Sequence, residues 1–178
     1  MTTIIETERL ILREITQNDK VDLFKLHTIP EVQLYTGEPV VEAMEEIERA
    51  IQSRIAHYNK YGYGRWATIL KPKMQFVGWA GLLYLPEFDE VDLGYRFLPN
   101  YWGMGIATEA SRAILKHGFD ELGIEKIVAI AMPENKASIR VMEKVGMVFY
   151  KFAPYEIGSE DVVWYWCDKD LYQTINTV

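Results

Sequence analysis

The sequence of 178 residues contains very little cysteine and no long apolar segment. Its single cysteine, Cys167, excludes an intramolecular disulfide framework and is typical of a reducing compartment. No apolar run reaches the roughly 18 residues that a membrane-spanning helix needs. Residues 1–6 lack the basic start and the long apolar core of a signal peptide. These absences predict a cytoplasmic protein without a membrane partner.

The chain also lacks an excess of positive charge. Its 19 Lys and Arg residues against 26 Asp and Glu residues give a formal net charge of -7. This balance argues against nucleic-acid binding through a general basic surface and is compatible with a cationic amine as substrate. The histidines, His27, His57 and His117, are far apart and show no metal-ligand spacing, so we expect no metal site.

Apolar residues recur at two periods, which predict short strands and amphipathic helices. Three closely spaced apolar runs leave no room for helices between them and favour an antiparallel meander. We predict a single domain over residues 1–178 with an α/β (α+β) fold, in which four helices flank a mixed, mostly antiparallel sheet of about seven strands. The strands are predicted at 10–12, 66–70, 74–85, 91–98, 127–131, 147–155 and 162–167, and the helices from about 19 to the stop at Ile29–Pro30, at 41–58, at 107–122 and at 136–145.

A turn with two glycines, Gly103 and Gly105, joins the strand at 91–98 to the helix at 107–122. Glycine lets backbone N–H groups approach a ligand, and a helix N-terminus attracts anions, so the turn suits a diphosphate. An ordinary turn that needs glycine for its backbone angles explains the spacing equally well. The turn lacks the lysine of a nucleotide-binding P-loop, and the preceding meander argues against a dinucleotide-binding fold.

Residues 101–110, Tyr-Trp-Gly-Met-Gly-Ile-Ala-Thr-Glu-Ala, resemble the coenzyme A motif of the GNAT superfamily of N-acetyltransferases. The closest resemblance is to the ribosomal-protein N-terminal (Rim-type) branch. Residues 6–13, Glu-Thr-Glu-Arg-Leu-Ile-Leu-Arg, and residues 135–146, Asn-Lys-Ala-Ser-Ile-Arg-Val-Met-Glu-Lys-Val-Gly, resemble two further stretches of the same family. The three stretches follow the family's order and span most of the chain.

The resemblance implies an N-acetyltransferase that uses acetyl-CoA as co-substrate and a primary amine as acceptor. A protein N-terminal α-amine is the first candidate acceptor, and a small amine (a polyamine, an amino acid or an aminoglycoside) is the second. A non-catalytic acyl-CoA-binding module is the alternative outside the enzyme class. The resemblance also implies the GNAT fold, in which the fourth and fifth strands, at 91–98 and 127–131, splay apart around the pantetheine arm. A homodimer is expected at the level of the family.

The same resemblance assigns the pyrophosphate to the backbone at 103–108, and the pantetheine arm and acetyl carbonyl to main-chain groups near Phe97 and Leu98. Asn135 would contact the pantetheine amide, and it is also a good helix N-cap. Relatives often carry Lys or Arg where Met104 stands, so nearby cations, with Arg140 and Lys136 as candidates, would assist. The predicted coenzyme-binding residues are Phe97, Leu98, Gly103, Met104, Gly105, Ile106, Ala107, Thr108, Asn135, Ser138 and Arg140.

Two residues are candidates for proton transfer. Many relatives place a tyrosine where Met142 stands, as acid for the leaving thiolate, and Ser138 is the best substitute because it shares the apolar helix face. The alternative is a serine that bonds to its own helix backbone. Asp92 is the candidate base, acting through water, with a solvated strand residue as the alternative. Glu87, Glu90 and Glu160 are weaker candidates for the base.

Overall fold

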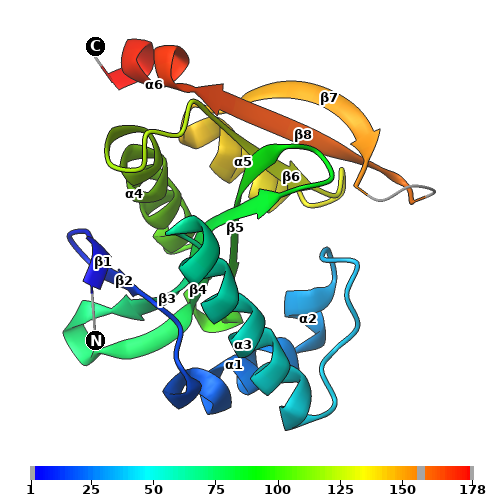
Figure 1. Cartoon of the computed structure of the whole chain (residues 1–178). Coiled ribbons are helices and arrows are strands. Elements are labelled where there is room, and N and C mark those ends of the chain that lie inside the picture. Colours follow the sequence, from blue (N-terminus) through cyan, green and yellow to red (C-terminus); the bar gives the residue numbers. More distant parts are fainter. Residues whose placement is uncertain (1–2, 156–158, 177–178) are drawn as a thin grey trace.

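The structure is a computed structural model that describes residues 3–155 and 159–176, so residues 1–2, 156–158 and 177–178 of the predicted domain lie outside it. In this part of the chain, eight strands form one sheet in the order β1-β2-β3-β4-β5-β6-β8-β7 (Figure 1). Among the strands that the structure describes, only β5 and β6 pair in parallel. The strands are β1 (Thr3–Glu6), β2 (Leu10–Arg13), β3 (Arg65–Leu70), β4 (Gln75–Leu85), β5 (Glu90–Phe97), β6 (Lys126–Ala131), β7 (Val148–Pro154) and β8 (Asp161–Asp168).

The predicted fold class is confirmed, with one strand and two helices more than expected. β1 was not predicted because its four residues carry no readable alternation, and pairing with β2 is what makes them a strand. Pro30 ends one helix as predicted but also begins a short second helix, since its fixed φ suits a first helical position. The α-helices are α1 (Lys20–His27), α2 (Pro30–Gln33), α3 (Met44–Tyr61), α4 (Ile106–Asp120), α5 (Lys136–Lys144) and α6 (Lys169–Asn176).

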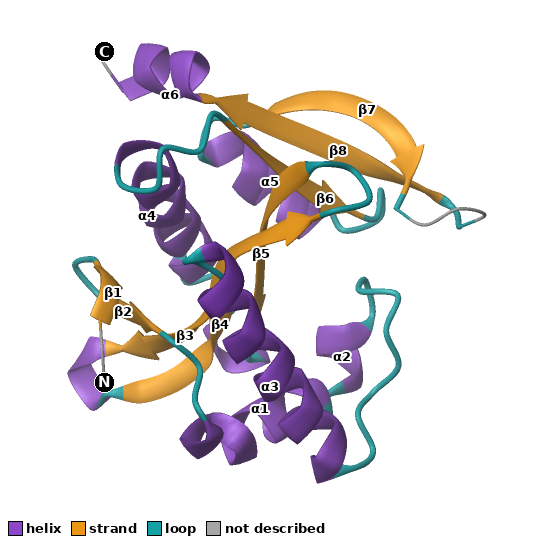
Figure 2. Ribbon diagram, viewed as in Figure 1, coloured by secondary structure: helices purple, strands orange, loops and turns teal. Residues whose placement is uncertain are grey.

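The sheet buries a separate apolar cluster on each face. Leu26 of α1 and Ile51 of α3 pack against Ile69 and Trp79 on one face. Residues of α4 and α5 pack with Leu82 and other strand residues on the opposite face. Figure 2 shows α1, α2 and α3 gathered in the lower half of the view, apart from α4, α5 and α6 in the upper half. None of the described helices is long and apolar enough to cross a membrane.

The predicted splay lies between the two parallel strands. β4 and β5 pair along the whole length of β5, from Glu90 to Phe97. In contrast, β5 and β6 pair only at Val91–Ile127 and Asp92–Val128, although β6 continues to Ala131. Beyond Asp92 the facing edges of β5 and β6 therefore have no ladder between them. An unpaired strand edge presents N–H and C=O groups that need partners, so this fork is a place for an extended ligand.

Candidate active site

The turn that follows β5 has the backbone conformation that its glycines permit. Gly103 and Gly105 have φ values of +74° and +77°, in the left-handed region where side chains are strained. These angles account for both glycines, as the ordinary-turn alternative requires. The turn is also open at Gly103, because no described residue other than its two chain neighbours has an atom within 4 Å of the position that a Cβ of Gly103 would occupy. The glycines therefore serve the backbone conformation of the turn and also leave its backbone accessible to a ligand.

Gly105 is the N-cap of α4, and its carbonyl accepts the first helical hydrogen bond from the N–H of Glu109 at 3.0 Å. The N–H groups of Ile106, Ala107 and Thr108 precede that bond and so lie outside the helical ladder. These N–H groups point away from the helix at its N-terminus, where the positive end of the helix dipole also favours an anion. The side chain of Ile106 is buried, which anchors the helix start to the core.

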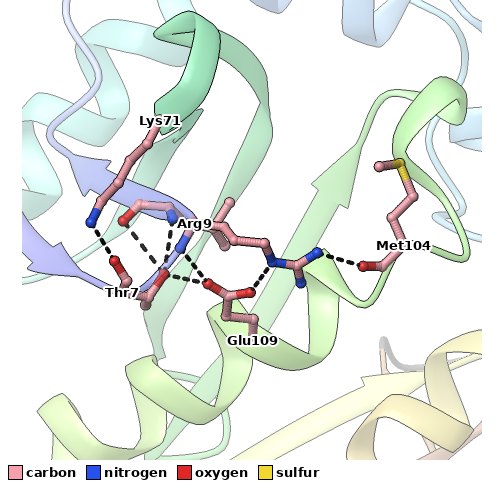
Figure 3. A network of polar contacts seen from close by, with 6 residues as sticks. Thr7, Arg9, Lys71, Met104 and Glu109 are labelled. Atoms are coloured by element: carbon pink, nitrogen blue, oxygen red, sulfur yellow. Dashed lines mark hydrogen bonds and ion pairs between the residues drawn. The ribbon is translucent and has the colours of Figure 1, made fainter.

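Arg9 and Glu109 connect the turn to the loop between β1 and β2 (Figure 3). Arg9 Nε donates to Glu109 Oε2 at 2.6 Å, and Thr7 Oγ1 donates to Glu109 Oε1 at 2.6 Å. Arg9 Nη1 donates to the carbonyl of Met104 at 3.0 Å, which holds the peptide between the two glycines. The hydrogen bonds from Thr7 and Arg9 outweigh partial burial and hold the pKa of the Glu109 carboxyl below its usual range.

A hollow of about 650 Å³ adjoins the turn at Gly105 and Thr108. Arg9, Arg112, Lys116 and Lys144 contribute its positive charge. The predicted cations, Arg140 and Lys136, are exposed on α5 instead and do not line this hollow. Sequence reasoning missed Arg112, although its position one helical turn after Thr108 is a usable signal.

Ser138 and Tyr95 form a hydroxyl pair beside the fork. Asn135 caps α5, as predicted, because its Oδ1 accepts from the N–H of Ser138 at 3.1 Å. The Ser138 hydroxyl lies 2.8 Å from the hydroxyl of Tyr95, so its partner is on β5. Burial raises the pKa of Tyr95 to about 12, so its hydroxyl keeps its proton at neutral pH. Tyr95 was not among the predicted site residues, although strand alternation places it on the α5 side together with Leu93 and Phe97.

The main-chain groups at the end of β5 are mostly engaged. The N–H of Leu98 donates to Val77 O at 2.9 Å, and its carbonyl accepts from the N–H of Tyr101 at 3.0 Å. The carbonyl of Phe97 accepts from Trp102 Nε1 at 2.7 Å. Successive N–H groups of a strand point to opposite edges, so the Phe97 N–H points away from β4 and toward the fork. Of the main-chain groups of Phe97 and Leu98, the N–H of Phe97 is therefore the one that remains for the predicted contact with the acyl donor.

Asp92 is buried on β5 and paired with Arg65 of β3, which corrects the solvated alternative. Arg65 also donates to the Asp92 carbonyl at 3.0 Å. Its side chain runs across Gly94, where a Cβ would lie 2.7 Å from Arg65 Nη2. Burial raises the pKa of the Asp92 carboxyl, and the Arg65 guanidinium offsets part of that rise. A proton taken up by Asp92 would leave the guanidinium unpaired, at about 3–5 kcal/mol for a buried pair, which argues against a free base here.

Three other titratable side chains, Cys167, Glu90 and His57, make contacts away from the proposed site. Cys167 of β8 is fully buried, and burial raises its pKa to about 11. Glu90 forms an ion pair with Lys126, across the parallel strands. His57 Nδ1 lies 2.8 Å from the carbonyl of Tyr63. None of these contacts involves the turn, the hydroxyl pair or the end of β5.

The match to known proteins covers most of the chain. Residues 9–148 match the family described as an acetyltransferase (GNAT) domain. The uncharacterized N-acetyltransferase YoaA of Bacillus subtilis is 32% identical over 147 residues, covering 82% of this chain and 83% of that protein. This chain belongs to the GNAT acetyltransferase family. Membership confirms the predicted N-acetyltransferase class, and acetyl-CoA is the acyl donor that GNAT enzymes use.

Solved GNAT structures with different acceptors share the fold. RimL, a ribosomal L7/L12 α-N-protein acetyltransferase in complex with coenzyme A, superposes with a TM-score of 0.80 at 21% identity, covering 96% of this chain and 99% of that chain. A spermidine N-acetyltransferase from Vibrio cholerae, in complex with CoA and spermine, gives a TM-score of 0.79 at 19% identity, covering 93% and 99%. At these identities the similarity shows the fold alone.

The opposite face of this GNAT sheet carries a second polar group of residues, under α1 and α3. Trp79 of β4 pairs with Arg96 of β5. The Trp79 indole N–H donates to His27 Nε2 at 3.3 Å, and Arg96 Nη1 lies 3.1 Å from His27 Nδ1. Burial and the neighbouring charges of Arg96 and Arg54 lower the pKa of His27 from 6.5 to about 3. His27 is therefore neutral wherever the protein is folded at ordinary pH.

Buried, neutral His27 predicts a loss of stability at mildly acidic pH. The unfolded chain binds a proton at this histidine below pH 6.5, and the folded chain binds it only below about pH 3, so stability rises with pH across that window. Between pH 7 and pH 5 the linkage amounts to about 2 kcal/mol. We expect His27→Gln to reduce by that amount the fall in unfolding free energy between pH 7 and pH 5, measured with urea.

His117→Gln is the matched control, because His117 is only half-buried and its pKa is lowered by burial in the same direction. It should remove less of the pH dependence than His27→Gln. An unchanged pH dependence in His27→Gln would show that His27 titrates normally in the folded protein.

Proposed function

We propose that this chain transfers the acetyl group of acetyl-CoA to a primary amine by direct attack of the amine on the thioester. The observation that carries the proposal is the fork between β5 and β6, which opens beside the anion-attracting start of α4. The similarity to RimL supports a protein N-terminal α-amine as acceptor, and the similarity to the spermidine enzyme supports a small amine.

The pyrophosphate of the donor is assigned to the N–H groups of residues 106–108, with Gly103, Met104 and Gly105 forming the turn around it. Backbone donors and a helix dipole suit a diphosphate without a lysine in the turn. Arg9 supports this role by fixing the Met104 carbonyl, and the hollow with Arg112 and Lys144 supplies further positive charge. Arg140, exposed on α5, remains a candidate for a contact with the outer phosphate.

The pantetheine arm is assigned to the fork, where it would supply hydrogen-bond partners to the facing edges of β5 and β6. Asn135 would contact the arm through the part of its side chain that does not cap α5. The N–H of Phe97 is the candidate donor to the thioester carbonyl oxygen as negative charge develops on it. One such donor is worth about 3 kcal/mol in enzymes of this chemistry.

Proton transfer is assigned to two places. The Ser138 and Tyr95 hydroxyl pair would donate a proton toward the leaving thiolate: Ser138 gives up its proton, the protonated Tyr95 hydroxyl replaces it, and water that has taken the proton of the amine returns one to Tyr95. The amine needs modest help, since about a tenth of an α-amine with a pKa near 8 is neutral at pH 7. Asp92 would assist only indirectly, by holding Arg65, while water accepts the proton.

Thr108→Glu separates coenzyme A binding from folding. A carboxylate in the first turn of α4 interacts favourably with the helix dipole, by about 0.3–1 kcal/mol, but repels a diphosphate at the same place. We expect the dissociation constant for CoA, measured by calorimetry, to rise at least tenfold while the unfolding free energy does not fall. Thr108→Gln is the control of equal size and should change CoA affinity far less. Equal CoA affinities in the two variants would show that the diphosphate does not bind at the N-terminus of α4.

Ser138→Ala and Tyr95→Phe test the hydroxyl pair. General acid catalysis contributes about 100-fold or more, so each variant should lower kcat for amine-dependent thiol release from acetyl-CoA by that order, with little change in CoA affinity. The double variant should cost no more than either single one, because the two hydroxyls act together. Tyr150→Phe, which removes an exposed hydroxyl on β7, is the control.

Unchanged kcat in Ser138→Ala would exclude this residue from the acid step. The same assay distinguishes the enzyme from a non-catalytic module. Tight CoA binding without thiol release on any peptide or small amine would favour the module.

A further inference from the structure

Three arginines surround one indole on the sheet face that α1 and α3 cover. We call Arg54, Arg65, Arg96 and Trp79 the arginine cluster. The guanidinium carbons of Arg54, Arg65 and Arg96 lie 5.0, 5.5 and 5.3 Å from the centroid of the Trp79 ring. They come from α3, β3 and β5 respectively. Three like charges gathered at this distance repel one another and require anions nearby.

The anions within the chain account for two of the three arginines. Arg65 is paired with Asp92. Arg96 Nη1 donates to Glu38 at 2.9 Å, but the Glu38 side chain is 60% exposed on the loop at 34–43. Arg54 forms no ion pair with the described residues, and its buried Nη1 has no hydrogen-bond partner among them. A buried donor without a partner costs about 1–3 kcal/mol, and more when it is charged.

His27 shows the same surplus of donors. Its two ring nitrogens face the Trp79 N–H and the Arg96 guanidinium, which both only donate. A neutral imidazole accepts at one nitrogen and donates from the other, so one of these contacts is unsatisfied. Burial, with repulsion from Arg65 and Arg96, lowers the pKa of Arg54 to about 10, which leaves it charged at neutral pH. Within residues 3–155 and 159–176, the arginine cluster thus lacks one negatively charged acceptor group.

The arginine cluster lies beside the fork. Arg96 belongs to the part of β5 that no longer pairs with β6, and it directly precedes Phe97. Because successive side chains of a strand point to opposite faces, Arg96 lies on the α1 and α3 side, whereas Tyr95 and Phe97 lie on the α4 and α5 side. An acceptor that approaches the thioester from the side opposite the hydroxyl pair therefore meets Arg96 first.

We propose that the acceptor is a small primary amine that carries a carboxylate, and that Arg54 and Arg96 bind this carboxylate. The inference rests on the proposed acetyl transfer and narrows its acceptor. A carboxylate supplies the missing acceptor atoms for Arg54 Nη1, and guanidinium groups bind carboxylates in fork geometry. Because Arg54 Nη1 is out of contact with solvent, the group that reaches it has to be small. A polyamine would bring only positive charge to three arginines.

Matched amines test the charge requirement directly. Thiol release from acetyl-CoA is measured with L-amino acids and with their carboxamides, which keep the amine and lose the negative charge. We expect kcat/KM for the carboxylates to exceed that for the amides at least tenfold. Aminoalkyl phosphonates show whether another anion substitutes for the carboxylate, and peptides with an acidic first residue show whether a protein N-terminus does. Equal or better turnover of amides, spermidine or such peptides would overturn the proposal.

Arg54→Met keeps the apolar stem and removes the charge. KM for carboxylate acceptors should rise at least tenfold, while kcat/KM for the amides and affinity for CoA stay within about twofold. Arg49→Met is the matched control, because Arg49 is exposed on the same helix. Glu38→Gln should lower KM for carboxylates, since it removes the chain's own competitor for Arg96. A rise in KM with Glu38→Gln would instead mean that Glu38 holds a cationic amine.

Direct binding separates failure of this inference from failure of the proposed function. Calorimetry with the CoA complex measures affinity for an amino carboxylate without any chemistry. Binding that Arg54→Met abolishes supports the carboxylate site even if no amine releases thiol, in which case only the transfer reaction is refuted. Thiol release with amides and no effect of Arg54→Met refutes the carboxylate site and leaves the transfer reaction standing.

Discussion

The short ladder between β5 and β6 is the constraint on which the site depends. The two parallel strands pair at Val91–Ile127 and Asp92–Val128 and then separate, while β4 and β8 hold their outer edges. Beyond these pairs, the edges of β5 and β6 face each other without a hydrogen-bond ladder, and main-chain groups in that position need partners. In the proposed mechanism, the donor and the acceptor would meet at the fork from opposite faces of the sheet.

The groups around the fork have separate tasks because they lie on different faces. In the proposed mechanism, the start of α4 would offer backbone donors on the α4 and α5 side, where the Tyr95–Ser138 pair would offer a proton. Arg9 belongs to this side, since it connects the first hairpin to the carbonyl of Met104. On the α1 and α3 side, three arginines surround Trp79. Asp92 and Glu38 pair with two of them, which leaves one positive charge without a paired carboxylate among the described residues. The chemistry is thus divided by strand alternation along β5.

Local patterns predicted seven of the eight strands and four of the six α-helices in the described residues, together with the glycine turn and the cap at Asn135, because those features depend on neighbours along the chain. Features that join distant segments were missed. Tyr95 and Ser138 are 43 residues apart, and no periodicity links them. Strand alternation did not reveal that Asp92 is buried, since its partner Arg65 lies two strands away. Arg54 was overlooked although it stands on the buried stripe of α3, between Ile51 and Tyr58, where an arginine is unusual.

A crystal structure of the chain with coenzyme A would show whether the acyl donor occupies the fork. We expect the diphosphate on the N–H groups of residues 106–108 and the pantetheine arm between β5 and β6, with its reactive end at the N–H of Phe97. The arm would then complete the ladder that stops at Asp92 and Val128. Coenzyme A bound elsewhere, or β5 and β6 paired with each other beyond Asp92 in the complex, would contradict the account.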